Sequence, residues 1–364
     1  MMPREYRVGI VGATGMVGQR LITLLEGHPW FRLRALAASP RSAGMPYREA
    51  VADRWFMDAP MPSSVASLTV MDAANVRDVA SQVDFIFCAV SMPKAETRAM
   101  EEAYARAEVP VVSNNSANRM QDDVPMIIPE INAAHAEVIP AQRRRLGTAR
   151  GFIVVKPNCS IQSYVPALTP LMDFGPMAVE VVTCQAVSGA GRTLEGWPEM
   201  DRNVIPFIPG EEEKSETEPL KIWGGLSGDG SRLVPARLPV ISAQCLRVPV
   251  EDGHLAAAGV KFERKPSRDE ILGRWASWRT LPEELGLPGA PSPFIEYREE
   301  QDRPQPMLDR DRGNGMAVTI GRLREDPVMD WRFISLSHNT LRGAAGGSVL
   351  TAELLCAQGY IQGQ

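Results

Sequence analysis

The sequence has little of the cysteine and histidine from which disulfide frameworks and most zinc sites are made. Its 364 residues include five cysteines and four histidines, and no two cysteines form a C-x-x-C pair. An odd number of widely separated cysteines argues against a disulfide framework and against a structural zinc site. We therefore expect reduced thiols and no metal.

Long apolar runs and a strong charge of one sign are missing as well. No stretch of about 18 apolar residues occurs, so no segment is expected to span a membrane. The opening residues, M-M-P-R-E-Y-R-V-G-I-V-G, lack the apolar run and small-residue cleavage site of a secretory signal peptide. A net charge of −5 offers no bulk attraction to nucleic acid. These absences predict a cytoplasmic protein without a nucleic-acid or membrane partner.

Short apolar runs alternate with helical stretches over the first 150 residues. The runs at 6–11, 31–37 and 83–90 predict strands, and 92–108 is helical in composition. The run V-D-F-I-F-C-A-V is almost continuous, as in a parallel strand that is covered on both faces. This pattern predicts a doubly wound α/β domain.

The alternation ends after residue 151, where loops become frequent. A chain of this length is expected to form two domains. We place the first at 1–157, completed by a C-terminal helix within 339–364, and the second at 158–338. Further strands are expected at 109–113, 123–128, 152–155, 179–186, 246–250, 260–263 and 331–337, with a helix over 160–172.

A glycine-rich loop, G-A-T-G-M-V-G, follows the first predicted strand and opens a helix. In that setting the free backbone N–H groups and the helix N-terminus favour a phosphate. The spacing G-x-x-G-x-x-G is a variant of the dinucleotide fingerprint, and a plain strand-to-helix turn is the alternative. The predicted cofactor contacts in this loop are Gly12, Thr14, Gly15, Met16 and Val17.

The segment after the second predicted strand reads A-A-S-P-R-S-A-G and contains no acid. An acidic residue there would bind the adenosine ribose of NAD. Ser39, Arg41 and Ser42 can instead accept a 2′-phosphate, the arginine through paired charge-assisted bonds. The segment therefore favours NADP(H), with an ordinary polar loop as the alternative.

Cys159, in K-P-N-C-S-I-Q, lies between a predicted strand and a predicted helix. Most cysteines only fill space. A helix N-terminus, however, lowers the pKa of a thiol and offers N–H donors to an oxyanion. A cysteine nucleophile also needs a nearby base, and the candidate is His254 in the strand-then-turn segment L-R-V-P-V-E-D-G-H, where Arg247 adds an anion-binding side chain. A packed cysteine and a surface histidine are the alternatives.

Nine segments in this order and spacing resemble the aspartate-semialdehyde dehydrogenases, and among them the archaeal and fungal branch. They are G-A-T-G-M-V-G, S-P-R-S-A-G, S-N-N-S-A-N-R-M, I-P-E-I-N, P-N-C-S, Q-A-V-S-G-A-G, N-V-I-P-F-I-P-G-E-E-E-K, R-V-P-V-E-D-G-H and H-N-T-L-R-G-A-A-G-G-S. The resemblance covers nearly the whole chain. It implies a Rossmann-type domain followed by an α+β catalytic and dimerisation domain of the glyceraldehyde-3-phosphate-dehydrogenase-like kind, in a homodimer or homotetramer.

The resemblance also implies roles for individual residues. Cys159 would be the nucleophile, His254 its acid–base partner, and Gln185 would lie beside the acyl group. The implied substrate contacts are Arg119, Asn158, Glu211, Lys214 and Arg247, and the further cofactor contacts are Ser188, Gly189, Asn339 and Gly346. Which of Glu211 to Glu213 meets the substrate ammonium stays open, and a solvated charged loop is the alternative for E-E-E-K.

The implied reaction is the reversible, NADPH-dependent reductive dephosphorylation of L-4-aspartyl phosphate to L-aspartate 4-semialdehyde through a Cys159 thioester. It would serve the biosynthesis of lysine, threonine and methionine. Two segments depart from the family pattern: Ile161 and Gln162 after P-N-C-S, and N-N-S-A-N before Arg119. These departures leave open a reductase of another activated acid such as malonyl-CoA. A non-catalytic NADP-binding protein is a further alternative.

Overall fold

The N-terminal part of the chain forms the first of two large sheets. The computed structural model describes residues 5–363, and in them six parallel strands lie in the order β3-β2-β1-β4-β5-β6. The strands are β1 Tyr6–Val11, β2 Phe31–Ala38, β3 Met71–Asp72, β4 Phe85–Cys88, β5 Val111–Ser113 and β6 Ile153–Val155. In a sheet with this order a dinucleotide binds at the C-terminal strand ends, where the strand order reverses. The predicted doubly wound α/β architecture is confirmed.

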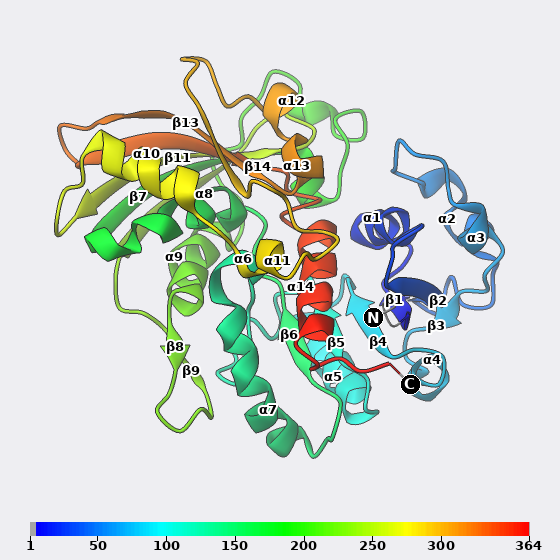
Figure 1. Ribbon diagram of the computed structural model, residues 1–364. Helices are drawn as coiled ribbons and strands as arrows, with labels where there is room; N and C mark the ends of the chain where they lie inside the picture. Colours follow the sequence, from blue (N-terminus) through cyan, green and yellow to red (C-terminus); the bar gives the residue numbers. More distant parts are fainter. Residues whose placement is uncertain (1–4, 364) are drawn as a thin grey trace.

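Helices pack on both faces of this sheet because its strands are apolar on both sides. The residues of β4 and β6 are all buried. On one face, α1 (Met16–Leu25) and α14 (Ala345–Ala357) share an apolar cluster with Val8. On the other face, α5 (Lys94–Arg106) shares a second cluster with Val11. Figure 1 shows α14, at the end of the chain, beside the N-terminal α1.

The second sheet has six strands in the order β10-β7-β11-β14-β13-β12 and is mixed, with β10 parallel to β7 and β12 parallel to β13. The strands are β7 Pro176–Gln185, β10 Val240–Arg247, β11 His254–Phe262, β12 Ile295–Arg298, β13 Val318–Glu325 and β14 Trp331–Ser337. Three helices pack on this sheet: α8 (Ile161–Leu168), α9 (Glu211–Ile222) and α10 (Arg268–Ser277). The predicted second, sheet-containing domain is thus confirmed as architecture, while the limits 1–157 and 158–338 stay predictions. Residues 1–4 and 364 of the predicted first domain lie outside the described residues.

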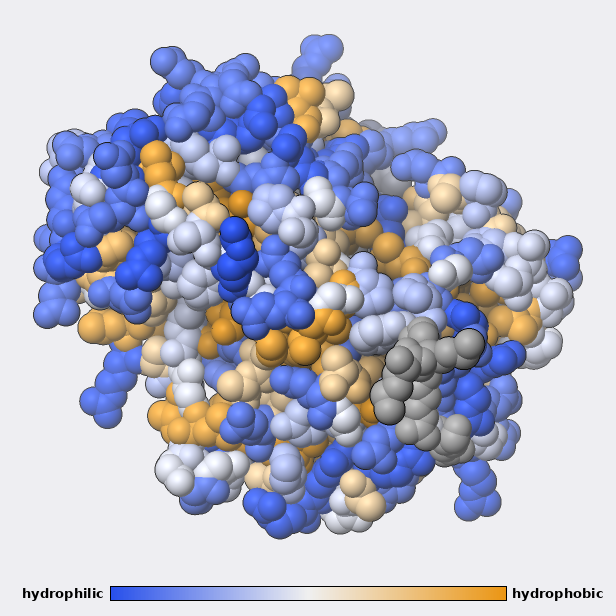
Figure 2. Space-filling model, in the orientation of Figure 1, coloured by the Kyte–Doolittle hydropathy of each residue, from blue (hydrophilic) through white to orange (hydrophobic). Residues whose placement is uncertain are grey.

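The remaining elements are short. They are α2 Tyr47–Val51, α3 Ser63–Ala66, α4 Val76–Ala80, α6 Pro129–Asn132, α7 Ile139–Leu146, α11 Leu281–Glu284, α12 Pro306–Asp309, α13 Arg312–Gly315 and the two-stranded sheet of β8 Gly225–Leu226 and β9 Leu233–Val234. Within residues 5–363, no helix combines the length and the apolar character that a membrane span requires. On the face shown in Figure 2, polar residues cover most of the surface and apolar residues form separate patches.

Several local predictions were wrong. The segment 123–128 forms no strand and makes a single bridge, from Met126 to Val155. The strand predicted at 246–250 ends at Arg247 and begins at Val240 instead, because Pro249 cannot donate to a ladder. The strand predicted at 260–263 begins earlier, since β11 opens at His254, which pairs with Ser337 of β14.

Candidate active site

Cys159 and His254 come together where the two sheets meet. Cys159 follows β6 and precedes α8, whereas His254 is the first residue of β11. The Cys159 Sγ lies 3.4 Å from the His254 Nε2. The Asn158 Oδ1 accepts hydrogen bonds from the Ser160 N–H and hydroxyl, each at 2.7 Å, which holds the turn that presents the thiol. The structure therefore brings together the pair that the sequence singled out.

The surroundings of His254 select one neutral tautomer. Its Nδ1 accepts the backbone N–H of Ala186 at 3.0 Å, so the single proton of the neutral ring is on Nε2 and points to the sulfur. Burial, and after it the positive charge of Arg247 and the neighbouring His338, hold the pKa of His254 well below its usual range. The ring is consequently a neutral hydrogen-bond donor to Cys159.

Charges of both signs surround the thiol. Burial is the main cause that raises the pKa of Cys159, and the carboxylate of Glu211 adds to it. Lys156, Arg119 and Arg247 act in the opposite direction. Cys159 is thus a partly buried thiol near three cations, whose positive charge favours its thiolate form.

Glu211 is the acid of the E-E-E-K run that belongs to this site. It is buried at the first position of α9, and its carboxylate accepts from Asn158 Nδ2 at 3.0 Å, Lys214 Nζ at 2.7 Å and Gln185 Nε2 at 3.3 Å. Glu212 accepts instead from the backbone of Cys245, and Glu213 is exposed. Three predicted residues thus donate to the carboxylate of a fourth, Glu211. The E-E-E-K run begins the helix α9 and is not a solvated loop.

Arg247 lies beside this group at the end of β10. Its Nη1 donates to the carbonyl oxygen of Ala186 at 2.7 Å, and the side chain is buried. A Cβ at Gly189 would lie 2.9 Å from this Nη1 and 3.0 Å from the His254 ring. Gly189 therefore lets its loop approach the arginine and the imidazole more closely than any other residue could.

Arg119 is held by internal partners. Its Nε donates to the Lys156 carbonyl at 3.0 Å, Nη1 to Glu218 Oε1 at 2.9 Å and Nη2 to the Asn114 carbonyl at 3.1 Å. Glu218 also accepts the backbone N–H of Asn158 at 2.6 Å. Lys156 and Glu218 lie in the site but were not predicted, because sequence alone assigns lysine and glutamate to the surface by default.

The glycine loop has the shape that a dinucleotide phosphate needs. Gly12 has a φ of +92°, and a Cβ there would overlap the Ala89 carbonyl. A Cβ at Gly15 would find nothing nearer than Gly12 O at 3.6 Å, so the space above the loop is open. Gly15 precedes α1, whose first N–H groups have no side-chain cap. These donors fit a phosphate at the helix N-terminus.

The other predicted cofactor residues fall into three places. Thr14, Met16 and Val17 are partly buried in the glycine loop and the first turn of α1, and Ser39, Arg41 and Ser42 form the turn after β2, with Arg41 exposed. Asn339 Nδ2 donates to Ser188 Oγ, and Ser188 donates to Asp252, both at 2.7 Å. Asn339 Oδ1 accepts the N–H of Gly253, the neighbour of His254, at 2.7 Å. Gly346 is buried at the start of α14.

Comparison with known proteins agrees with this geometry. Residues 7–139 match the family model for the semialdehyde dehydrogenase NAD binding domain, and residues 168–342 match that for the semialdehyde dehydrogenase dimerisation domain. The aspartate-semialdehyde dehydrogenase of Archaeoglobus fulgidus is 44% identical over 98% of this chain and 100% of its own length. That of Methanothermobacter thermautotrophicus is 46% identical over 96% of this chain and 98% of its own.

Solved structures show the same fold. The crystal structure of aspartate semialdehyde dehydrogenase with NADP from Candida albicans superposes with a TM-score of 0.88 at 35% identity, covering 98% of this chain and 100% of that one. The Vibrio cholerae aspartate semialdehyde dehydrogenase II complexed with ASA gives a TM-score of 0.73 at 25% identity, with 97% and 98% covered.

Proposed function

This chain belongs to the aspartate-semialdehyde dehydrogenase family, and we infer from that membership that Cys159 is the residue on which its reaction takes place. The enzyme converts L-4-aspartyl phosphate, NADPH and a proton reversibly into L-aspartate 4-semialdehyde, NADP⁺ and phosphate. The observation that carries the assignment to Cys159 is the 3.4 Å contact of its Sγ with His254 Nε2 beside buried Glu211 and Arg247.

Two buried charges suit the two ends of an amino acid. The Arg247 guanidinium keeps one nitrogen on Ala186 O and can offer its other donors to the substrate α-carboxylate, a forked geometry that lysine cannot copy. Glu211, whose present partners are Lys214, Asn158 and Gln185, would exchange the lysine for the substrate ammonium. The released Lys214 is then available for the phosphate, together with Arg119, which uses three of its five N–H donors internally.

The chemical steps follow from these positions. The Cys159 sulfur attacks the acyl carbon, the C–S bond forms, and the C–O bond to phosphate breaks. Bound NADPH supplies the hydride that reduces the resulting thioester. Backbone N–H groups at the start of α8, with His254 Nε2–H, stabilise the oxyanion. Breaking the C–S bond then returns the thiolate and releases the aldehyde.

The cofactor is NADP(H), and the glycine loop with the turn after β2 would hold it. The open N-terminus of α1 suits the pyrophosphate. The exposed Arg41, with Ser39 and Ser42, suits the 2′-phosphate. Ser188, Asn339 and Gly346 would border the nicotinamide end. The relatives reported above give no support to a malonyl-CoA reductase or to a non-catalytic binding protein.

The direct test is the oxidation of aspartate semialdehyde by the purified chain. We expect NADPH to form with NADP⁺ and phosphate. We expect little NADPH when CoA replaces phosphate. When NAD⁺ replaces NADP⁺, we expect a rate at least about tenfold lower, because the charge-assisted contact to the 2′-phosphate is lost and such a contact contributes about 1.5–3 kcal/mol. Turnover with CoA alone would assign the chain to another acyl donor, and equal rates with NAD⁺ would remove the role of Arg41.

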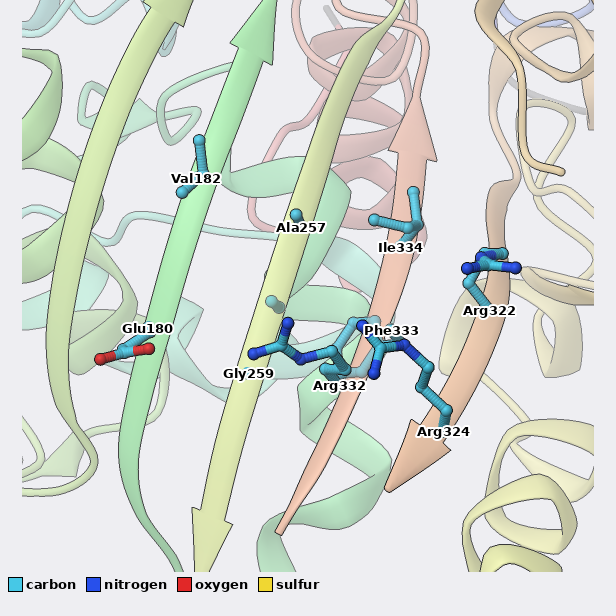
Figure 3. A pocket seen from close by; sticks show the side chains of 10 residues that line it. Glu180, Val182, Ala257, Gly259, Arg322, Arg324, Arg332, Phe333 and Ile334 are labelled. Carbon is cyan, nitrogen blue, oxygen red and sulfur yellow. The ribbon is translucent and has the colours of Figure 1, made fainter. Parts of the chain in front are cut away.

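We propose that the enzyme is a homo-oligomer assembled through the open face of its second sheet. Figure 3 shows that Glu180 on β7, Ala257 on β11, Arg332 on β14 and Arg324 on β13 share this face. In a two-fold assembly the carboxylate of one copy can meet the arginines of the other. The match to a family model named for dimerisation supports this proposal.

Sedimentation tests the assembly. The wild type is expected at twice or four times the chain mass of 39.9 kDa, and Ala257→Arg, which adds a cation to the centre of the face, is expected to shift it towards the monomer. Leu285→Arg, an exposed position after α11, is the control. A monomeric wild type would exclude the assembly, and an Ala257→Arg variant with the same mass as the wild type would exclude this face.

We further propose a cytoplasmic location, which the five unpaired cysteines support.

A further inference from the structure

Glu218 joins two parts of the candidate site that are distant in the sequence. It lies on α9 and is 2% exposed. Its Oε1 accepts a hydrogen bond from Arg119 Nη1 at 2.9 Å, and its Oε2 accepts the backbone N–H of Asn158 at 2.6 Å. Asn158 directly precedes Cys159. One buried carboxylate thus ties the candidate phosphate-binding arginine to the turn that presents the nucleophile.

The two hydrogen bonds explain why this position holds a glutamate. Each oxygen of the Glu218 carboxylate receives one donor, and an ionised carboxylate offers acceptors only. The amide of a glutamine has the same shape but a single oxygen. Its NH₂ group would therefore face either the Arg119 guanidinium or the Asn158 N–H, donor against donor. Glutamine at this position can keep one of the two bonds and not both.

The helix α9 holds Arg119 by its backbone as well as by its side chain. Lys221, three residues after Glu218, donates from Nζ to the carbonyl oxygen of Arg119 at 2.6 Å. Glu211, seven residues before Glu218, accepts from Asn158 Nδ2 at 3.0 Å. Helical spacing places these three side chains on one face of α9. The position of Arg119 relative to the nucleophile turn is thus set by a single helix.

The guanidinium of Arg119 has donors left for a ligand. Its Nε donates to the carbonyl oxygen of Lys156 and its Nη2 to that of Asn114, while Nη1 donates to Glu218. One N–H on each terminal nitrogen remains. Glu218 is the charged partner among the three, so its loss would leave a buried guanidinium with carbonyl partners alone.

We propose that Glu218 is a positioning residue that fixes Arg119 relative to the Cys159 sulfur. It acts through Arg119 and the Asn158 peptide. In the oxidative direction a phosphate oxygen attacks the thioester carbon, the C–O bond forms, and the C–S bond breaks to return the thiolate. A phosphate held in line with that carbon reacts faster than one that is free to move. The inference rests on the proposed function in taking Arg119 as a phosphate contact.

The test is the protection of Cys159 by inorganic phosphate against alkylation by iodoacetamide, followed on the peptide that contains Cys159 in the full chain. Iodoacetamide is neutral and does not compete for the cations of the site. Glu218→Gln is expected to raise the half-protecting phosphate concentration at least about tenfold, because a charge-assisted bond that orients Arg119 is lost. Glu213→Gln makes the same change at an exposed position of α9 and is expected to leave the concentration unchanged.

Arg119→Met, with and without Glu218→Gln, separates positioning from a general loss of structure. If Glu218 acts through Arg119, the double variant and Arg119→Met should have half-protecting concentrations within about threefold of each other. The double variant removes both members of the buried ion pair, so it is expected to fold even if Glu218→Gln alone does not. The KM for NADP⁺ should stay within about twofold of the wild type in Glu218→Gln, whereas the KM for phosphate rises.

Three results would overturn the proposal. They are an unchanged half-protecting concentration in Glu218→Gln, a further tenfold rise when this change is added to Arg119→Met, and equal rises in the KM values for NADP⁺ and phosphate. Undiminished protection in Arg119→Met would remove the phosphate contact of Arg119 from the proposed function, and the role of Glu218 with it. Protection needs no turnover, so a failure of the proposed reaction would be seen separately, as a wild type that phosphate protects but that forms no NADPH.

Discussion

Replacing Cys159 by serine is expected to lower the phosphate-dependent formation of NADPH from aspartate semialdehyde by roughly 10⁴-fold or more, the scale of losing a nucleophile. A serine hydroxyl is not ionised near neutral pH, so it needs a base that takes its proton. The side chain in contact with this position, His254, presents an N–H to it because its Nδ1 is occupied by the Ala186 N–H. The measurement is the initial rate at saturating NADP⁺ and phosphate.

Cys184→Ser is the control for this experiment. Cys184 is a half-buried thiol on β7 and has no part in the proposed steps, so its variant should stay within a few-fold of the wild type. Both variants should bind NADP⁺ alike. More than about 1% of wild-type activity in Cys159→Ser would mean that another residue forms the covalent intermediate, because removal of a nucleophile leaves far less.

Glu130→Ala is expected to lower the free energy of unfolding by about 3–5 kcal/mol, because it leaves a buried guanidinium without its anion. Glu130 on α6 receives both terminal nitrogens of Arg342, and the side chains are 0% and 1% exposed. Arg342 also donates to the carbonyl of Met316 at 2.9 Å and lies 4.9 Å from the Phe294 ring. A urea titration of the wild type and the variant measures the difference.

The matched control removes a carboxylate from an exposed pair. Asp173 and Arg274 lie 3.1 Å apart with side chains 72% and 45% exposed, so Asp173→Ala is expected to cost less than about 1 kcal/mol. Adding Arg342→Met to Glu130→Ala should recover much of the loss, since no unpaired charge remains. If Glu130→Ala lowers the free energy of unfolding no more than Asp173→Ala does, the buried ion pair stabilises the fold no more than an exposed one.

The sequence predicted the first sheet better than the second for a physical reason. The strands of the first sheet are covered on both faces, so β1 and β4 read as continuous apolar runs. The second sheet has an open face, and β10 reads V-I-S-A-Q-C-L-R with exposed and buried positions mixed. Its pattern is weak, and both β10 and the start of β11 were misplaced.

The candidate site likewise has a part that the sequence predicted and a part that it did not. Cys159, His254 and the glycine loop lie in short segments whose local pattern indicates their chemistry. The partners of these segments come from distant parts of the chain, as when Glu218 accepts from Arg119, 99 residues away. Nothing in the sequence near Lys156 indicates that its ammonium is buried. That burial depends on the packing of α14, which only the folded chain brings there.

The position of α14 bears on how the chain is made. The strands of the first sheet have all been synthesised by residue 155, yet the helix that packs beside α1 ends at Ala357. Residues Ala345 to Cys356 are all buried in the finished protein. While a ribosome extends the chain, about two hundred residues pass between the last strand of that sheet and its missing helix. The nucleotide half thus emerges first but is completed only after the second sheet has been made, and the nascent chain keeps an apolar face uncovered until α14 has been synthesised.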